Sequence, residues 1–131
     1  MTQIRISIAA DLLGVSDDTL RRWVEAGRLT GGTDDSGRQS VDGAALAALA
    51  QELAEGDPLG EGSRSARNHL TGLVTRVVSD KVMSQVELQC GRFRVVSLIS
   101  TEAVEELGLE VGVVATAVIK ATNVTIERNR A

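Results

Sequence analysis

Apolar residues in the first part of the chain recur at helical spacing. Apolar side chains at positions 8, 9, 12 and 13 form one stripe, which predicts a helix that begins at the N-cap Ser7 and ends at Gly14. Ser16 is a favourable N-cap for a second helix, which turns positions 20, 23 and 24 inward and ends at Gly27. Two short helices joined by a tight turn with glycine predict a helix-turn-helix.

The polar segment that follows predicts a hairpin and then a boundary. Thr30–Gly43 is polar and rich in glycine, which is typical of a hairpin or wing. Asp42 can cap a third helix over Ala44–Leu53, which ends near Gly56. Residues 55–68 contain the only proline, three glycines and no apolar period, so this stretch predicts a linker.

The pattern after the linker changes from helical to strand-like. Apolar Val86, Leu88 and Cys90 alternate with polar residues, which is the period of two of a half-buried strand. The same reasoning predicts a short helix over Thr101–Leu107 and five strands, namely Leu70–Val78, Val82–Cys90, Phe93–Ile99, Val113–Lys120 and Val124–Ile126. Five short strands with a helix between the third and fourth predict an OB-like barrel.

Together these patterns predict an α+β chain with two domains. Residues 1–54 form a small all-α winged helix-turn-helix domain, residues 55–64 a linker, and residues 65–131 a five-stranded OB-like β-barrel with one short helix.

Composition excludes several classes of protein. Aromatic residues make up 2% of the 131 residues, namely Trp23 and Phe93, which disfavours single-stranded nucleic-acid binding by base stacking. The lone Cys90 excludes an intrachain disulfide and a cysteine-based zinc site. The chain has no apolar run of membrane-spanning length and no signal-peptide pattern, so we expect a cytoplasmic protein that does not enter a membrane.

The net charge of −4 is unevenly distributed. Residues 1–54 carry a net −3 and residues 55–63 another −3, whereas the chain from Arg64 onward carries a net +2. A basic C-terminal half favours binding of an anion there. An acidic N-terminal half does not favour DNA binding, because neutralised phosphates supply much of the affinity for DNA.

The C-terminal half resembles the molbindin family, also called Mop or TOBE, over residues 65–128. Three segments carry the resemblance, namely Ser65–Asn68, Thr101–Leu109 and Ala117–Val124. The resemblance implies a small OB-like barrel that dimerises, often builds larger rings, and binds molybdate or tungstate at subunit interfaces. It implies no organic cofactor, and no residue that ligates a metal cation directly.

A tetrahedral dianion requires charged and neutral donors that converge from several directions. Arg67 and Lys120 supply charged donors, and three hydroxyl side chains and the amides at the start of the short helix supply neutral ones. The resemblance implies an oxyanion site formed by Ser65, Ala66, Arg67, Asn68, Ser100, Ala103, Lys120, Ala121 and Thr122. Ser100 stands where the family usually has threonine, and Ala103 where it often has serine.

The N-terminal half resembles the winged helix-turn-helix of the MerR or excisionase type over roughly residues 4–45. Three segments carry the resemblance, namely Ala9–Ser16, Thr19–Trp23 and Glu25–Leu29. The wing departs from the pattern, because Asp34 and Asp35 are acidic and Ser40 lies where a tyrosine is expected. In such domains the second helix enters the major groove of DNA. The resemblance implies DNA contacts by Ser16, Thr19, Arg21, Arg22, Arg28 and Arg38.

These resemblances predict a molybdate-responsive transcriptional regulator that binds double-stranded DNA as a homo-oligomer, a dimer or a multiple of dimers. One alternative is a molbindin-type storage protein with a degenerate helix-turn-helix. Another is an oligomerising adaptor for protein partners. We expect no enzyme and no catalytic residues, because nothing places a nucleophile or second acid beside the Glu105–Glu106 pair.

Overall fold

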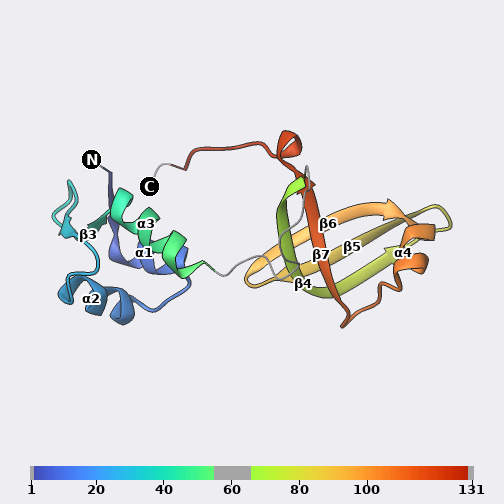
Figure 1. Cartoon of the computed structure of the whole chain (residues 1–131), viewed down its shortest axis with the longest axis horizontal. Helices are drawn as coiled ribbons and strands as arrows, with labels where there is room; N and C mark the ends of the chain where they lie inside the picture. Colours follow the sequence, from blue (N-terminus) through green and yellow to red (C-terminus); the bar gives the residue numbers. More distant parts are fainter. Residues whose placement is uncertain (1, 55–65, 130–131) are drawn as a thin grey trace. The chain divides into compact units, whose positions relative to one another are not determined.

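The computed structural model describes residues 2–54 and 66–129, and these form two compact units (Figure 1). Residues 2–54 lie in the N-terminal unit and residues 66–128 in the C-terminal unit. The predicted linker at residues 55–64 lies outside the described residues. The α+β class is confirmed, and no described helix is long and apolar enough to cross a membrane.

The N-terminal unit packs three helices with a small sheet. The helices are α1 (Ile6–Leu13), α2 (Asp17–Glu25) and α3 (Gly43–Leu53). The sheet is antiparallel, in the order β1 (Gln3–Arg5), β3 (Gln39–Asp42), β2 (Gly31–Thr33). The predicted hairpin is therefore confirmed as β2 and β3, but the predicted all-α class is wrong for this unit. The three residues of β1 are too few to show a strand period, so the pattern did not indicate them.

The start of the first helix differs from the prediction. The N-cap is Arg5, which makes no side-chain capping hydrogen bond, and Ser7 lies inside α1. The buried residues of α1 are Ile6, Ala9 and Ala10, which lie at spacings of three and four, whereas Leu12 is 60% exposed. The period was thus predicted correctly, but the apolar face is rotated relative to the prediction.

The next two helix starts agree with the sequence. The hydroxyl of Ser16 accepts a hydrogen bond from the N–H of Thr19 at 3.1 Å, and the carboxylate of Asp42 accepts one from the N–H of Ala45 at 3.1 Å. Each bond satisfies one of the N–H groups that a helix leaves unpaired in its first turn.

Replacing Ser16 with alanine is expected to destabilise the N-terminal unit by about 1 kcal/mol, because the N–H of Thr19 then loses its acceptor. Ser7→Ala is the matched control, since Ser7 lies within α1 and caps nothing. It should leave stability unchanged or raise it slightly, because alanine favours helix. Urea unfolding of the full chain measures both, and equal effects of the two variants would contradict this assignment of the caps.

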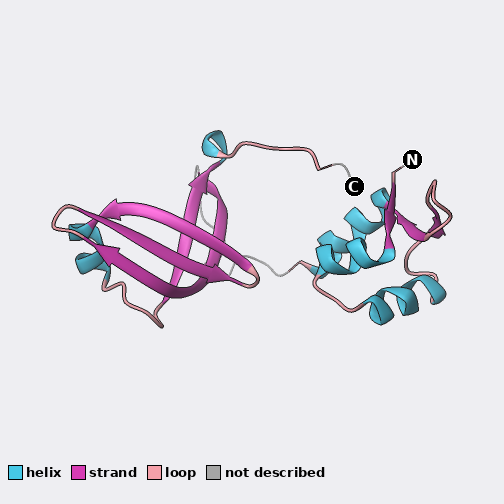
Figure 2. Ribbon diagram, turned by 180° about the vertical axis from the view of Figure 1, so that it is seen from behind, coloured by secondary structure: helices cyan, strands magenta, loops and turns pink. Residues whose placement is uncertain are grey.

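The C-terminal unit is a curved antiparallel sheet with one short helix (Figure 2). The strand order is β6-β5-β4-β7. The elements are β4 (Ala66–Ser79), β5 (Met83–Cys90), β6 (Phe93–Ser100), α4 (Thr101–Leu107), β7 (Val114–Lys120) and the 3-10 turn η1 (Ala121–Asn123). The alternation predicted for β5 is confirmed, because Val86, Leu88 and Cys90 are buried in the core of this unit.

The long strand β4 joins two halves of the sheet. Its first part, from Ala66 to Leu73, pairs with β7, and its second part, from Leu73 to Ser79, pairs with β5. The chain changes partner beside Gly72, where the backbone of β5 approaches so closely that a side chain would not fit.

The predicted fifth strand is absent. Residues 124–129 form no strand, and the described sheet of this unit has four strands instead of five. The edge strands β6 and β7 border a groove of about 490 Å³, lined mainly by aliphatic side chains such as Val95, Ile99 and Val113. The apolar residues of the predicted strand are exposed, with Ile126 at 87%.

Candidate functional site

A β-bulge places Arg67 beside the end of β7. Ala66 pairs with Lys120 and Asn68 with Ile119, so two residues of β7 face three residues of β4. Arg67 is the extra residue, and it is exposed, as is Lys120. A bulge redirects side chains out of the regular alternation of a strand. The backbone positions of the two predicted cations are therefore neighbours on adjacent strands at one end of the sheet.

The neighbours of Arg67 hold this bulge in shape. The amide of Asn68 donates a hydrogen bond to the carbonyl oxygen of Ile119 at 3.2 Å. The Nε2 atom of His69 lies 2.8 Å from the carbonyl oxygen of Ala66. Asn68, predicted as a ligand contact, thus has a bond to the neighbouring strand, and sequence reasoning did not find the link between His69 and Ala66.

The chain turns sharply directly after Lys120. Ala121 and Thr122 lie in η1, both exposed, and η1 contacts β4. A 3-10 turn leaves its first N–H groups without partners inside the turn. The predicted contacts Ala66, Arg67, Asn68, Lys120, Ala121 and Thr122 are brought together here. Ser65 lies outside the described residues.

The remaining predicted contacts lie at the start of α4. The hydroxyl of Ser100 caps this helix by accepting a hydrogen bond from the N–H of Ala103 at 3.1 Å. Accepting this bond leaves the hydroxyl proton of Ser100 able to donate. Ala103 contributes its amide to the cap and is half-buried.

A chain of hydroxyl groups fixes the start of α4 to the turn between β4 and β5. The Oγ of Ser84 lies 2.6 Å from that of Ser79 and 2.8 Å from Oγ1 of Thr101. Thr101 in turn donates to the carbonyl oxygen of Asp80 at 2.8 Å. The N–H groups of Met83 and Val82 lower the pKa of the Asp80 carboxyl below its ordinary value, because they stabilise its charged form.

The two groups of predicted oxyanion contacts lie at opposite ends of β4. At the first end of β4, Ala66 pairs with Lys120. At the second end, Ser79 pairs with Ser84 of β5. The residue before Ser84, Met83, pairs in turn with Ser100 of β6. The strand between them measures on the order of 40 Å, at about 3.3 Å per residue. One copy of the chain therefore does not bring all the predicted contacts to one site.

The predicted DNA contacts of α2 form a network among themselves. Ser16 donates to Oγ1 of Thr19 at 2.9 Å, and Nη2 of Arg22 donates to the same oxygen at 3.1 Å. Arg21 lies 3.5 Å from the exposed carboxylate of Asp18, one turn away. Surface ion pairs of this kind contribute little to stability, so Arg21 can exchange this partner for another anion.

Arg28 and Arg38 lie outside α2. The guanidinium of Arg28 lies over the ring of Trp23, 5.3 Å from its centroid, and Trp23 is half-buried against the core as predicted. Arg38 is exposed and precedes β3 in the wing.

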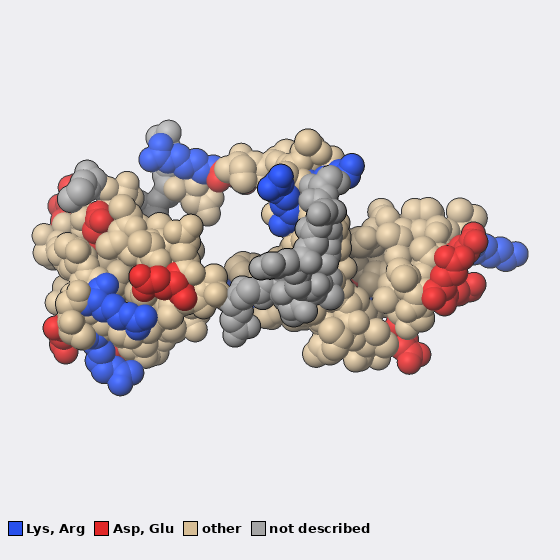
Figure 3. All heavy atoms as spheres, in the orientation of Figure 1, with Lys and Arg blue, Asp and Glu red and all other residues tan. Residues whose placement is uncertain are grey.

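On the face shown in Figure 3, basic and acidic side chains of the N-terminal unit intermingle, while acidic side chains gather over α4 in the C-terminal unit.

Ion pairs at two carboxylates, Asp34 and Glu87, were not predicted. Asp34 pairs with Arg5 at 3.1 Å in the N-terminal unit. In the C-terminal unit Glu87 is buried although its position in β5 predicts exposure, because Arg76 and Arg94 both pair with its carboxylate and cover it. Within residues 2–54 and 66–129, no three His, Cys, Asp or Glu side chains are arranged to hold a metal ion.

Comparison with known proteins assigns the C-terminal half. The family model of the TOBE domain matches residues 64–126. Molybdenum-pterin-binding protein 3 of Clostridium pasteurianum is 45% identical over 65 residues, which are 49% of this chain and 96% of that protein. A probable molybdenum-pterin-binding protein of Haemophilus influenzae is 44% identical over 63 residues, which are 47% of this chain and 91% of that protein.

A solved structure of a molybdate binding protein from Sporomusa ovata aligns with a TM-score of 0.49 and 28% identity, over 51% of this chain and all of that chain. The relatives from Clostridium pasteurianum and Haemophilus influenzae are named for binding and not for catalysis. The matching family model covers residues of the C-terminal half, so the helix-turn-helix of the first half stays a prediction. Through its C-terminal unit, the chain belongs to the TOBE-domain family.

Proposed function

We propose that the C-terminal unit binds molybdate or tungstate and that the N-terminal unit binds operator DNA, so that the chain acts as a molybdate-responsive transcriptional regulator. The observation that carries the first part is the bulge that sets Arg67 beside Lys120 in a domain whose relatives are named as molybdenum-pterin-binding proteins.

The chemistry of the bulge favours the oxyanion over the pterin. A guanidinium supplies a planar fork of donors and an ammonium a compact positive charge, and both suit the oxygens of a dianion. A flat pterin ring stacks well on the large aromatic side chains, and of Phe, Trp and Tyr this unit has only Phe93. Phe93 begins β6, which does not pair with the first part of β4 or with β7.

A complete site requires a second copy of the chain. The group around Arg67 and the group around Ser100 lie at opposite ends of β4. A single copy of the chain therefore cannot use both groups to bind one oxyanion. Large apolar residues that a lone domain would bury, such as Val114, Val118 and Leu98, are exposed on the edge strands. These features support a homo-oligomer in which the first group of one copy meets the second group of another.

The case for DNA rests on α2 and the wing. Arg21 and Arg22 are exposed on a helix that follows a tight turn, and Arg38 is exposed on the wing of the same unit. Two such units in a dimer would read a symmetric site. The oxyanion changes DNA affinity only if it binds one arrangement of the dimer more tightly than the other.

A DNA-binding assay with and without the ligand tests the regulator. We expect the full chain to form complexes with specific genomic DNA fragments at low salt. Its affinity for these fragments should change when molybdate is added and not when sulfate is added. An Arg21→Ala/Arg22→Ala variant should weaken binding and reduce its dependence on salt, because about two phosphate contacts are lost.

Two results would contradict parts of this proposal. Equal DNA affinity with and without molybdate would exclude the response to the ligand. Binding of molybdate without any specific DNA complex would instead favour storage, in line with the acidic charge of the N-terminal half.

A further inference from the structure

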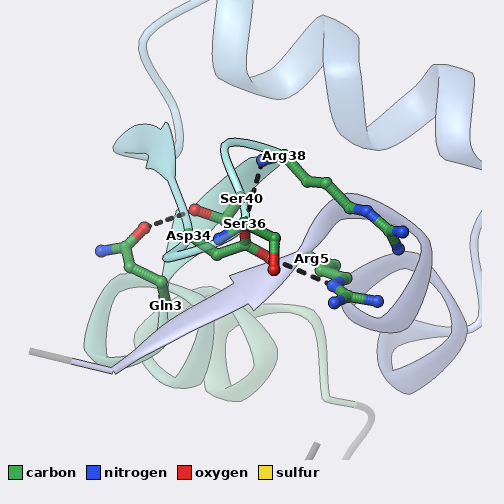
Figure 4. Close-up of polar contacts among 6 residues, drawn as sticks. All are labelled: Gln3, Arg5, Asp34, Ser36, Arg38 and Ser40. Atoms are coloured by element: carbon green, nitrogen blue, oxygen red, sulfur yellow. Dashed lines mark hydrogen bonds and ion pairs between the residues drawn. The ribbon is translucent and has the colours of Figure 1, made fainter.

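Asp34 organises the tip of the wing. Its Oδ1 atom accepts hydrogen bonds from the N–H groups of Ser36 at 2.9 Å and Arg38 at 3.0 Å (Figure 4). Its backbone carbonyl accepts another from Gly37 at 3.0 Å, and its own N–H donates to the carbonyl of Arg38 at 2.9 Å. All the bonds that close this loop therefore involve Asp34 or its backbone.

The geometry of the loop depends on the carboxylate. Gly37 has a φ of +77°, in the left-handed region that glycine adopts without strain, and this turns the backbone back towards β3. In this position the N–H of Arg38 points at the Asp34 side chain. The arginine side chain extends away from the turn in Figure 4. The hydrogen bond to Asp34 thus sets the direction in which Arg38 leaves the wing.

Arg5 neutralises this acid and ties the wing to the body of the unit. Its Nε atom donates to Oδ2 of Asp34 at 3.1 Å, and it lies at the junction of β1 and α1. The hydrogen bond from the N–H of Arg38, and then those from Arg5 and Ser36, lower the pKa of the Asp34 carboxyl below its ordinary value, against the opposing effect of partial burial. The carboxylate is therefore ionised and paired at neutral pH.

We propose that Asp34 is a positioning residue for DNA binding, which acts through the wing turn by holding Arg38 in the direction of the phosphate backbone. This inference rests on the DNA-binding role proposed above. It reverses the expectation from charge alone, by which an acid in the wing repels DNA.

A pair of alanine variants separates the two expectations by the sign of the effect. Asp35 is the next residue, is exposed and takes no part in the hydrogen bonds of the turn. Asp34→Ala and Asp35→Ala remove the same charge from the same loop. We expect Asp35→Ala to tighten DNA binding slightly and Asp34→Ala to weaken it about fivefold, since the turn loses its acceptor.

A rescue variant and a double variant test the route through Arg38. Asp34→Asn keeps Oδ1 as the acceptor of the turn and loses only the bond from Arg5, because its amide nitrogen does not accept. It should restore affinity to within about twofold of wild type, since asparagine suits this turn position. In an Arg38→Gln background, Asp34→Ala should have no further effect, since the residue it positions is gone. Fluorescence anisotropy of a labelled operator fragment measures each affinity.

The outcomes distinguish this role from the proposed function. Tighter binding by both alanine variants, or an equal loss from Asp34→Ala with and without Arg38, would overturn the positioning role while leaving DNA binding intact. No specific complex with the wild-type chain would contradict the proposed function, and the positioning role with it. Amide exchange at Ser36 and Arg38, expected to be faster in Asp34→Ala and unchanged in Asp35→Ala, provides a measurement that does not depend on DNA.

Discussion

Gly72→Ala is expected to destabilise the C-terminal unit by more than about 3 kcal/mol and to prevent its folding at moderate temperature. A Cβ atom at this position would lie 2.2 Å from the carbonyl oxygen of Gln89 and 2.8 Å from Sγ of Cys90. The obstacle is the backbone of β5, which a change of rotamer cannot move. Relief would require β4 to separate from β5 where Leu73 pairs with Gln89.

The control for this prediction is a glycine that is constrained in another way. Gly91, in the turn between β5 and β6, has a φ of +60° but open space where a side chain would be. Gly91→Ala should cost only about 1 kcal/mol, the strain of a left-handed alanine. Calorimetric unfolding of the full chain measures both variants. A Gly72→Ala protein as stable as Gly91→Ala would contradict the close approach of β4 and β5.

Arg67→Ala/Lys120→Ala is expected to abolish saturable binding of molybdate. Each lost hydrogen bond to a charged group weakens binding by roughly 1.5–3 kcal/mol. The two substitutions together should therefore lower the affinity for molybdate about a hundredfold or more. Both side chains are exposed, so their removal should leave the fold intact. Isothermal titration with molybdate, and with sulfate as a second tetrahedral dianion, measures the effect.

A matched variant removes two positive charges from elsewhere in the same unit. Arg92, in the turn between β5 and β6, and Arg128, after η1, are exposed and are not among the predicted oxyanion contacts. Arg92→Ala/Arg128→Ala should retain most of the affinity for molybdate. Equal losses in the two double variants would show that overall charge governs binding and would contradict a site at the bulge.

Local signals in the sequence predicted most of the elements. The caps Ser16 and Asp42 and the helix end at Gly14 depend only on residues within one turn, so the sequence alone suffices to locate them. The alternation in β5 is likewise local. Ser7 failed as a cap because β1 leads directly into α1 two residues earlier, and that strand exists only through its pairing with β3.

Features that depend on distant partners could not be predicted in this way. Val124–Ile126 has the apolar, β-branched composition of a strand, but a strand also needs an edge to pair with, and composition does not supply one. The alternation in β5 predicts an exposed side chain at Glu87. Glu87 is nevertheless buried, and Arg76 and Arg94 from the flanking strands pair with its carboxylate.

The candidate site shows the same division. The motif around Arg67 and the motif around Lys120 are distant in sequence, and their meeting follows from the pairing of β4 with β7. The separation of Ser100 from both follows from the length of β4, which no motif encodes. The wing contact of Asp34 had a weak local signal, since an aspartate three residues before a glycine is typical of a tight turn.

The position of Trp23 gives the chain an internal optical reporter. It is the only tryptophan, the chain has no tyrosine, and it packs within the N-terminal unit beneath the guanidinium of Arg28. Intrinsic emission therefore responds to the folding of that unit and to any molecule that displaces Arg28 from the ring. Circular dichroism in the far ultraviolet responds to both units, so comparing the two signals during one urea titration isolates the unfolding of the C-terminal unit.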